Sequence, residues 1–279
     1  MARREDLKQF WGAFRCQTGT LRGEGSSTPL VAPGRAPAWL ALHGYCGTPE
    51  EMRLVVEVAQ SGGFQVEAPV LRGHCTHARD LAPLGFDDWY EGVRSSFLSA
   101  AARGPVVVVG LSLGSLLATR LALEYPERVL GLALLANAFF LSPFPSWPLR
   151  SVDRLGLRDF GVPKLGSDIG DEVARRSHLS YSVQPVGPAI RLLRAAERLF
   201  AELPRLTCPT LVVHGAKDRL CPVSNAWRVA AQIGSDRTRV VILPRSHHIV
   251  TRDFDREQLR VELTHFAARL GLTEQADKQ

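Results

Sequence analysis

The sequence contains no apolar run long enough to cross a membrane. Its most apolar stretch covers residues 129–144 and is interrupted by Asn137, whereas a membrane-spanning helix needs about 20 consecutive apolar residues. The first eight residues, MARREDLK, also lack the apolar segment of a signal peptide. We therefore expect a protein without a membrane span that stays in the cytoplasm.

Cysteine is scarce and irregularly placed. The five cysteines are Cys16, Cys46, Cys75, Cys208 and Cys221. Their number is odd and no Cys-x-x-Cys pair occurs, which argues against a disulfide framework. Reduced thiols are expected, in keeping with a cytoplasmic location.

Clusters of positive charge are also lacking. The 279 residues include 34 lysines and arginines against 28 aspartates and glutamates, which gives a net charge of +6. The excess is scattered, and no nucleic-acid-binding motif accompanies it, so we expect no nucleic-acid partner. An apolar fraction of 45% and a charged fraction of 22% are ordinary for a globular protein and exclude a disordered or fibrous chain.

Short aliphatic runs alternate with longer stretches of helical spacing. The runs lie at residues 39–43, 64–68, 105–109, 129–135, 210–214 and 239–243. Apolar runs without internal alternation are typical of strands that are buried on both faces. This pattern predicts an α/β fold with a mostly parallel central sheet and helices on both faces.

The alternation lapses between residues 137 and 204. This stretch is rich in Phe, Pro, Trp and Arg, and residues 188–203 have strong helical spacing. We interpret it as a small cap inserted over the sheet, so that residues 1–279 form a single domain. The apolar residues at 138–149 fit ordinary packing, or an acyl tunnel that makes weak contact with a lipid surface.

The strongest chemical signal is the segment from Gly110 to Gly114, which reads Gly-Leu-Ser-Leu-Gly. It follows the valines at 106–109 and precedes a leucine-striped helix, so Ser112 should occupy a sharp turn from strand to helix. The amide of Leu113 would then lie at a helix N-terminus, which favours an anion. The alternative is a glycine-rich connection with an unimportant serine.

A serine nucleophile needs a base and a carboxylate that orients the base. Asp218 follows the predicted strand at 210–214, and His247 and His248 follow the strand at 239–243. The carboxyl ends of parallel strands meet at one sheet edge, so these side chains should approach Ser112. The residues alone leave the choice of histidine open, and Asp218 could instead be a turn or capping residue.

A second small-residue segment follows the strand at 39–43. His43-Gly44-Tyr45-Cys46-Gly47 would let the backbone approach a ligand closely. The amides of Tyr45 and Leu113 could then hold the oxyanion formed when a serine attacks a carbonyl. A plain glycine turn is the alternative.

Together these residues resemble the α/β-hydrolase superfamily, and within it the small carboxylesterases and monoacylglycerol lipases (the lysophospholipase-like group). The matching segments are Leu42-His-Gly-Tyr-Cys-Gly-Thr-Pro-Glu-Glu-Met, Ala68-Pro-Val-Leu-Arg-Gly-His, Asp87-Asp-Trp-Tyr, Gly110-Leu-Ser-Leu-Gly-Ser, Cys208-Pro-Thr-Leu-Val-Val-His-Gly-Ala-Lys-Asp-Arg-Leu-Cys-Pro and Ser246-His-His-Ile-Val-Thr-Arg-Asp. They span roughly residues 38–265 in the order of the family. One departure is Cys75, where the family usually has a glycine after Gly-His.

The resemblance implies an α/β-hydrolase fold with an eight-stranded, mostly parallel sheet and a cap. It makes Ser112 the nucleophile, Asp218 the acid and His248 the base, and it selects His248 over its neighbour. The oxyanion donors map to the amides of Tyr45 and Leu113. The family uses no cofactor and no metal, so we expect none here, including at the His74, Cys75 and His77 cluster.

The expected function is that of a serine hydrolase acting on a small-molecule ester through an acyl-enzyme intermediate. Short-to-medium acyl esters or monoacylglycerols are the favoured substrates. A thioesterase, an amidase or a peptidase would use the same triad, and a non-enzymatic binding protein on this fold should lack part of it. A dehalogenase or epoxide hydrolase would need an aspartate in place of Ser112. The sequence gives no prediction of oligomeric state.

Overall fold

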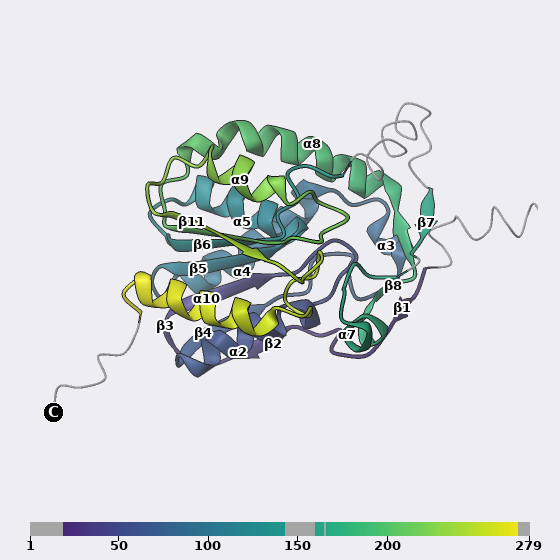
Figure 1. The fold of residues 1–279 in the computed structure, drawn as a ribbon, viewed down its shortest axis with the longest axis horizontal. Coiled ribbons are helices and arrows are strands. Elements are labelled where there is room, and N and C mark those ends of the chain that lie inside the picture. The colour runs from purple at the N-terminus through teal and green to yellow at the C-terminus, as the bar shows by residue number, and fades with distance from the viewer. Residues whose placement is uncertain (1–18, 143–159, 165, 273–279) are drawn as a thin grey trace, which may run out of the picture.

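The computed structural model describes residues 19–142, 160–164 and 166–272. A seven-stranded sheet runs through their centre in the order β11-β10-β6-β5-β3-β4-β2 (Figure 1). The strands are β2 (Leu30–Ala32), β3 (Arg35–Leu42), β4 (Phe64–Ala68), β5 (Val106–Leu111), β6 (Val129–Leu135), β10 (Thr210–Gly215) and β11 (Thr238–Leu243). Every pairing is parallel except that of β2 with β4.

Strand β5 shows why the sheet is covered on both sides. Its four valines, at 106–109, are all fully buried and point alternately to opposite faces. Val106 and Val108 join the core on the side of α4 (Phe86–Ala101), α5 (Leu113–Glu124), α8 (Val186–Glu202) and α9 (Ser224–Ala230). Val107 and Val109 join the core on the side of α2 (Arg53–Ser61) and α10 (Arg256–Arg269). The predicted fold class is confirmed.

All six predicted strands are present, with bounds that shift by a few residues at most. The expected eighth strand is absent from the sheet in the described part of the chain. Strand β1 (Leu21–Arg22) pairs instead with β8 (Ser180–Tyr181) outside the sheet, and β2 forms an antiparallel edge. The short elements η2 (Pro49–Met52) and α3 (Ala78–Leu81) complete the first half of the chain.

Between β6 and β10 the described residues form several short elements and one 17-residue helix, α8. These are β7 (Gly161–Pro163), α7 (Glu172–Ser177), β8, β9 (Val183–Pro185), α8 and η3 (Leu203–Arg205). Strands β7 and β9 pair antiparallel, and α8 runs along the top of the molecule in Figure 1. Of the expected cap, residues 143–159 and 165 lie outside the described residues, as do the first eight residues of the chain.

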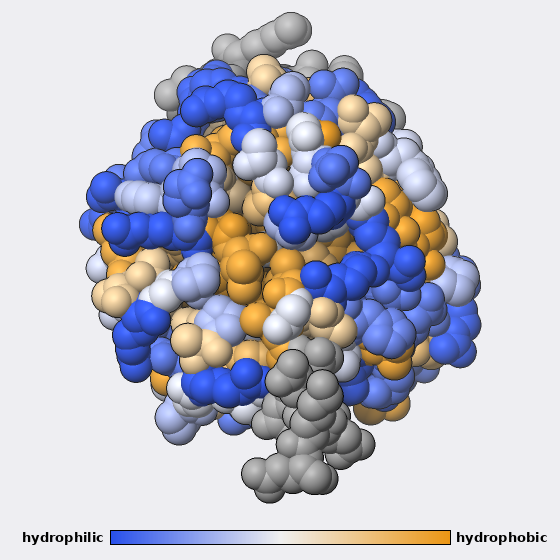
Figure 2. Space-filling model, turned by 90° about the vertical axis from the view of Figure 1, so that its left-hand side faces the viewer, coloured by the Kyte–Doolittle hydropathy of each residue, from blue (hydrophilic) through white to orange (hydrophobic). Residues whose placement is uncertain are grey.

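Figure 2 shows the end of the molecule that lies away from β7, β8 and α7. Polar side chains cover most of this face, and a band of apolar residues is visible between them. Some apolar exposure is normal for a globular protein. Among the described helices, none combines the length and the apolar character that a bilayer crossing requires.

Candidate active site

The turn from β5 to α5 holds Ser112 in a strained conformation. Its φ of 55° and ψ of −113° lie in a region that side chains other than glycine rarely adopt. A Cβ atom on Gly110 would lie 2.1 Å from the carbonyl oxygen of Gly114, and one on Gly114 would lie 2.1 Å from that of Leu42. The two glycines are therefore required by close backbone approach, as the sequence predicted.

The structure brings Ser112, Asp218 and His248 together at the carboxyl edge of the sheet. The Ser112 Oγ atom lies 2.9 Å from Nε2 of His248, and Nδ1 of His248 lies 2.8 Å from Oδ2 of Asp218. The three residues follow β5, β10 and β11 respectively. Because the carboxylate only accepts, the imidazole proton is assigned to Nδ1, which leaves Nε2 to accept from the serine hydroxyl.

Electrostatics support this arrangement. Burial opposes the charged form of His248, but the nearby Asp218 carboxylate more than offsets it and raises the pKa of the imidazole well above its usual value. Burial likewise opposes ionisation of Asp218, yet the charge of His248 and hydrogen bonds from His214 and His248 hold its pKa below the usual value. Oδ1 of Asp218 also accepts the amides of Leu220 and Cys221, at 2.9 and 2.8 Å.

The neighbouring histidine has a different environment. The Asp253 carboxylate accepts the backbone amide of His247 at 2.7 Å and lies 3.3 Å from its Nδ1 atom. The same carboxylate accepts the amides of Gly170 and Asp171, both at 2.9 Å. His247 therefore anchors its loop to the insertion, and His248 is the histidine that faces Ser112.

The predicted oxyanion segment runs beside the serine. A Cβ atom built on Gly44 would lie 3.4 Å from Cβ of Ser112, so this backbone passes directly alongside Ser112. The Tyr45 side chain reaches away and donates to the carbonyl of Pro185 in β9. Leu113 opens α5, where the helix dipole favours negative charge. Leu113 follows Ser112 directly, and Tyr45 follows Gly44, whose backbone passes beside Ser112.

Two buried histidines hold the segment in place, a role that the sequence analysis assigned to neither of them. Nε2 of His43 accepts the amide of Leu71 at 3.2 Å, and Nε2 of His74 accepts the amide of Cys46 at 3.2 Å. Both rings must be neutral to accept these bonds. Burial lowers the pKa of each ring, that of His74 to about 3. The only available signal was their position beside glycines.

Beneath the segment lies a fully buried carboxylate, Glu51. Its Oε2 atom accepts the Gly44 amide at 3.0 Å, and Oε1 lies 2.9 Å from Nε2 of His178 in the insertion. A Cβ atom on Gly47 would lie 2.4 Å from the carboxylate carbon, so a larger residue there would have to displace this carboxylate. Burial opposes ionisation, but the hydrogen bonds from His178 and from the Gly44 amide lower the pKa of Glu51 to about 2.

Cys221 is a further buried neighbour of the three side chains. Within the described residues, Asp218, Cys221 and His248 form a group whose potential metal-ligand atoms all lie within 4.8 Å of one another. An ion at this position would engage the same side chains that face Ser112, so we assign it no metal role. Neither Cys221 nor His214, which lies 3.0 Å from Asp218, was predicted as part of the site.

Comparison with known proteins agrees with the geometry of the site. A model of the family described as serine aminopeptidase, S33 (Hydrolase_4), matches residues 36–255. The chain belongs to this family. The predicted membership of the α/β-hydrolases, in the group of small esterases and monoacylglycerol lipases, is confirmed.

Several relatives carry names that describe an activity. The chain is 27% identical over 245 residues to a thermostable monoacylglycerol lipase of a Bacillus species, covering 86% of this chain and 94% of the relative. A palmitoyl-protein thioesterase of the rat, ABHD10, is 27% identical over 61% of this chain and 54% of its own length. A solved structure of one of the metagenome-derived lipolytic enzymes LipS and LipT superposes with a TM-score of 0.81 at 28% identity, covering 87% and 98% of the two chains.

Proposed function

We propose that this protein hydrolyses carboxylic esters, with monoacylglycerols or other short-to-medium acyl esters as substrates. The observation that carries the proposal is the chain of contacts from Ser112 through His248 to Asp218. A hydroxyl, an imidazole and a buried carboxylate in this order make a nucleophile out of a serine. The family and the lipase relatives support the same chemistry.

The proposed reaction has two steps. Nε2 of His248 takes the Ser112 proton as Oγ attacks the ester carbonyl, and then donates that proton to the departing alcohol. Water, deprotonated by the same nitrogen, attacks the acyl-enzyme and releases the carboxylic acid, and the proton returns to Ser112. Asp218 orients the ring and stabilises its charged form throughout.

The oxyanion of each tetrahedral intermediate would rest on the amides of Tyr45 and Leu113. The proximity of the Gly44 backbone to Ser112 and the position of Leu113 at a helix start support this role. Losing one such donor typically costs about 3–4 kcal/mol of transition-state stabilisation. Glu51, His43 and His74 are positioning residues in this scheme, because they hold the backbone that carries the donors.

Residues 1–279 are proposed to form one domain in which 137–204 act as a cap over the site. Contacts of Tyr45 with β9 and of Glu51 with His178 support close packing of this segment on the catalytic edge. Phe139 and Phe140, at the start of this segment, pack against Phe200 in α8. The predicted lipid contact involves the apolar run at residues 138–149, of which 143–149 lie outside the described residues. A cytoplasmic location is also proposed, and none of the four described cysteines forms a disulfide bond.

A substrate panel with identification of the acylated residue tests the proposal. Native protein, S112A and the exposed control S61A are assayed on p-nitrophenyl esters of two to twelve carbons and on monoacylglycerols. We expect S112A to lose at least about 1000-fold in kcat/KM, S61A to match the native protein, and a fluorophosphonate probe to label Ser112. Absence of hydrolysis at every chain length, or a fully active S112A, would refute the proposal.

A thioesterase is the second candidate, and the similarity to ABHD10 favours it. Thioester and oxygen-ester cleavage use the same attack and the same proton transfers, so the residues named above do not separate them. Matched acyl-coenzyme A and p-nitrophenyl substrates of equal chain length decide by their ratio of kcat/KM. An aminoacyl p-nitroanilide in the same panel tests the peptidase chemistry that the family description names.

A further inference from the structure

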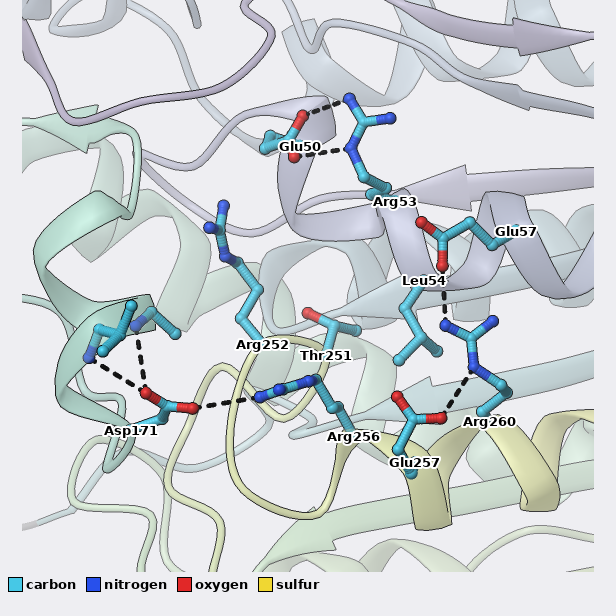
Figure 3. A pocket seen from close by; sticks show the side chains of 12 residues that line it. Glu50, Arg53, Leu54, Glu57, Asp171, Thr251, Arg252, Arg256, Glu257 and Arg260 are labelled. Atoms are coloured by element: carbon cyan, nitrogen blue, oxygen red, sulfur yellow. Dashed lines mark hydrogen bonds and ion pairs between the residues drawn. The ribbon is translucent and has the colours of Figure 1, made fainter.

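Several carboxylates on the surface of this protein are paired with arginines. Figure 3 shows such pairs in a surface pocket between α2, α7 and α10, where Arg53 contacts Glu50 and Arg260 contacts Glu57, each at 2.7 Å. The lining contains four arginines and four acids, so its charges balance. The carboxylate of the candidate active site differs, because among the described residues Asp218 forms no ion pair with a lysine or an arginine.

Asp218 is surrounded by backbone amides and imidazole rings instead. Its Oδ1 atom accepts the amides of Leu220 and Cys221, and its Oδ2 atom lies 2.8 Å from Nδ1 of His248. A second ring faces the same oxygen, since Nε2 of His214 lies 3.0 Å from Oδ2. The side chains of His214 and Asp218 are both fully buried. The proposed proton transfers make no use of this second ring.

The contacts of His214 determine which of its nitrogens carries hydrogen. Nε2 faces two oxygens, the carbonyl of Cys221 at 3.2 Å and Oδ2 of Asp218 at 3.0 Å, and both are acceptors, so Nε2 is protonated. Nδ1 is buried and has no hydrogen-bond partner among the described residues. A second proton at Nδ1 would bury a charged N–H group without an acceptor, which is costly. The ring of His214 is therefore neutral and presents its N–H to the two oxygens.

A tight turn after β10 brings His214 and Asp218 together. The Asp218 amide donates to the carbonyl of Gly215 at 3.3 Å, so the chain reverses directly after the strand. The Cys221 amide then donates to Oδ1 of Asp218, and the Cys221 carbonyl accepts from Nε2 of His214. Residues 214–221 thus form a closed loop that fixes the His214 N–H beside the carboxylate.

We propose that His214 is a positioning residue for the reaction, and that its Nε2–H weakens the attraction between the Asp218 carboxylate and the charged form of His248. The positive end of this N–H bond lies beside Oδ2, the oxygen that Nδ1 of His248 also contacts. It offsets part of the negative charge and therefore opposes the imidazolium. His248 then becomes a neutral base at a lower pH than it would beside Asp218 alone.

Cys221 is a further titratable side chain that faces Asp218 and His248. Its thiol stays neutral, because burial raises its pKa. The ionisation of His248 therefore depends on two opposing groups, the Asp218 charge that favours the imidazolium and the His214 N–H that opposes it. The inference rests on the proposed function, because that reaction is what requires His248 to act as a base.

Three substitutions test the inference in the native full-length protein. H214L removes the N–H group, whereas H214Q keeps an N–H donor at about the same distance from the backbone. V212A is the matched control, because Val212 is fully buried two residues earlier in β10 and its side chain points to the same side of the sheet. Two readouts are followed against pH, namely kcat/KM for one p-nitrophenyl ester and the NMR titration of the His248 ring in protein that carries isotope-labelled histidine and no substrate.

We expect both readouts to move to higher pH in H214L. Loss of the N–H and its replacement by an apolar side chain both favour the imidazolium–carboxylate pair, which has no net charge, and the expected shift is about 0.5–1 pH unit. At a pH below this transition, kcat/KM should fall by about threefold to tenfold. H214Q and V212A should stay within about 0.2 pH unit of the native protein, although V212A should unfold at a lower urea concentration.

A purely structural role for His214 predicts the opposite sign. If the ring only supported the turn, H214L would loosen the contact of Asp218 with His248 and move both readouts to lower pH. A shift to lower pH, no shift, or an equal shift in H214Q would therefore overturn the inference. If H214L does not fold, the ring nitrogen signals of native His214 still decide, since a hydrogen on Nδ1 contradicts the proposed tautomer. An NMR shift as expected without ester hydrolysis would refute the proposed function alone, and hydrolysis without the shift would refute this inference alone.

Discussion

Oε1 of Glu51 lies 2.9 Å from Nε2 of His178, although 127 residues separate the two in the sequence. The contact joins the backbone beside Ser112 to the insertion. Both side chains are almost completely buried, with Glu51 anionic and His178 neutral, because burial lowers the pKa of the imidazole despite the nearby carboxylate. The neutral ring donates from Nε2 and accepts from the Ser167 hydroxyl at Nδ1.

This arrangement predicts unequal effects of two substitutions at Glu51. E51A leaves the Gly44 amide and His178 Nε2 without an acceptor and should lower the free energy of unfolding by about 3 kcal/mol. E51Q should cost about 1 kcal/mol or less, because His178 can move its proton to Nδ1, where the Ser167 oxygen accepts. Urea denaturation measures both.

E91A serves as the control, since Glu91 is an exposed acid on α4 whose removal should change stability by no more than about 0.5 kcal/mol. A loss in E51Q as large as that in E51A would show that the charge itself, rather than the pattern of acceptors, stabilises this contact.

The adjacent histidines provide a matched pair. H248Q removes the nitrogen that faces Ser112 and should lower kcat/KM for an ester by about 100-fold to 10,000-fold. H247Q removes a ring that lies against Asp253 and does not face Ser112. Its kcat/KM should therefore stay within a few-fold of the native value. Steady-state kinetics on one p-nitrophenyl ester compares them. Equal losses in the two variants would contradict the assignment of the base.

The pH dependence of the rate should follow the ionisation of His248. The base must be neutral, and Asp218 raises the pKa of the imidazole, so kcat/KM should rise with pH through neutrality and level off above it. D218N removes the charge that favours the imidazolium. The rise of kcat/KM should then occur at lower pH, and the maximal rate should also be reduced. Profiles between pH 5.5 and 9.5 measure the shift. A limb that stays at the native pH in D218N would contradict the pairing.

Stability should also fall in mild acid. The folded protein keeps His43, His74 and His178 neutral, because burial lowers the pKa of each. The unfolded chain binds those protons below about pH 6.5, so the free energy of unfolding decreases as pH falls. H74Q keeps an acceptor for the Cys46 amide and should reduce this slope between pH 6 and 5 by about 1 kcal/mol per unit. Urea titrations at both pH values test this, and an unchanged slope would show that His74 is already protonated when folded.

Two glycine-to-alanine substitutions should have opposite effects on the stability of the fold. G114A places a Cβ atom 2.1 Å from the Leu42 carbonyl oxygen and should destabilise the fold by several kcal/mol, because backbone on both sides must move. Gly92 is exposed within α4 and has no atom within 4 Å of the added Cβ. G92A should stabilise the protein by about 0.5–1 kcal/mol through helix propensity. Thermal unfolding compares the two, and a neutral G114A would contradict the close packing of the turn.

The sequence predicted those parts of the fold and site that depend on local chemistry. Strand β5 could be predicted from its valines, because a strand buried on both faces needs apolar residues without alternation. The position of Ser112 could be predicted because a sharp turn requires the glycines on either side of it, Gly110 and Gly114. The choice of His248 over His247 came from the family resemblance and not from spacing, since adjacent residues satisfy the same pattern.

The missed residues depend on contacts that their spacing in the sequence does not reveal. Glu51 reads as an ordinary helix-start acid, and its burial depends on His178 arriving from the insertion. His214 and Cys221 lie near Asp218 in the sequence, but nothing in their spacing shows that they point at its carboxylate. No pattern of period 2 or 3.6 carries such information.

By itself the sequence determined the parallel sheet, the serine turn and the chain order of Ser112, Asp218 and His248, because burial and backbone sterics act on neighbouring residues. Only the tertiary structure decided which buried charges are paired and which histidine meets the serine. Those outcomes depend on distances between segments that fold from opposite ends of the chain, and hydrogen bonding and ion pairing fall away within a few ångströms.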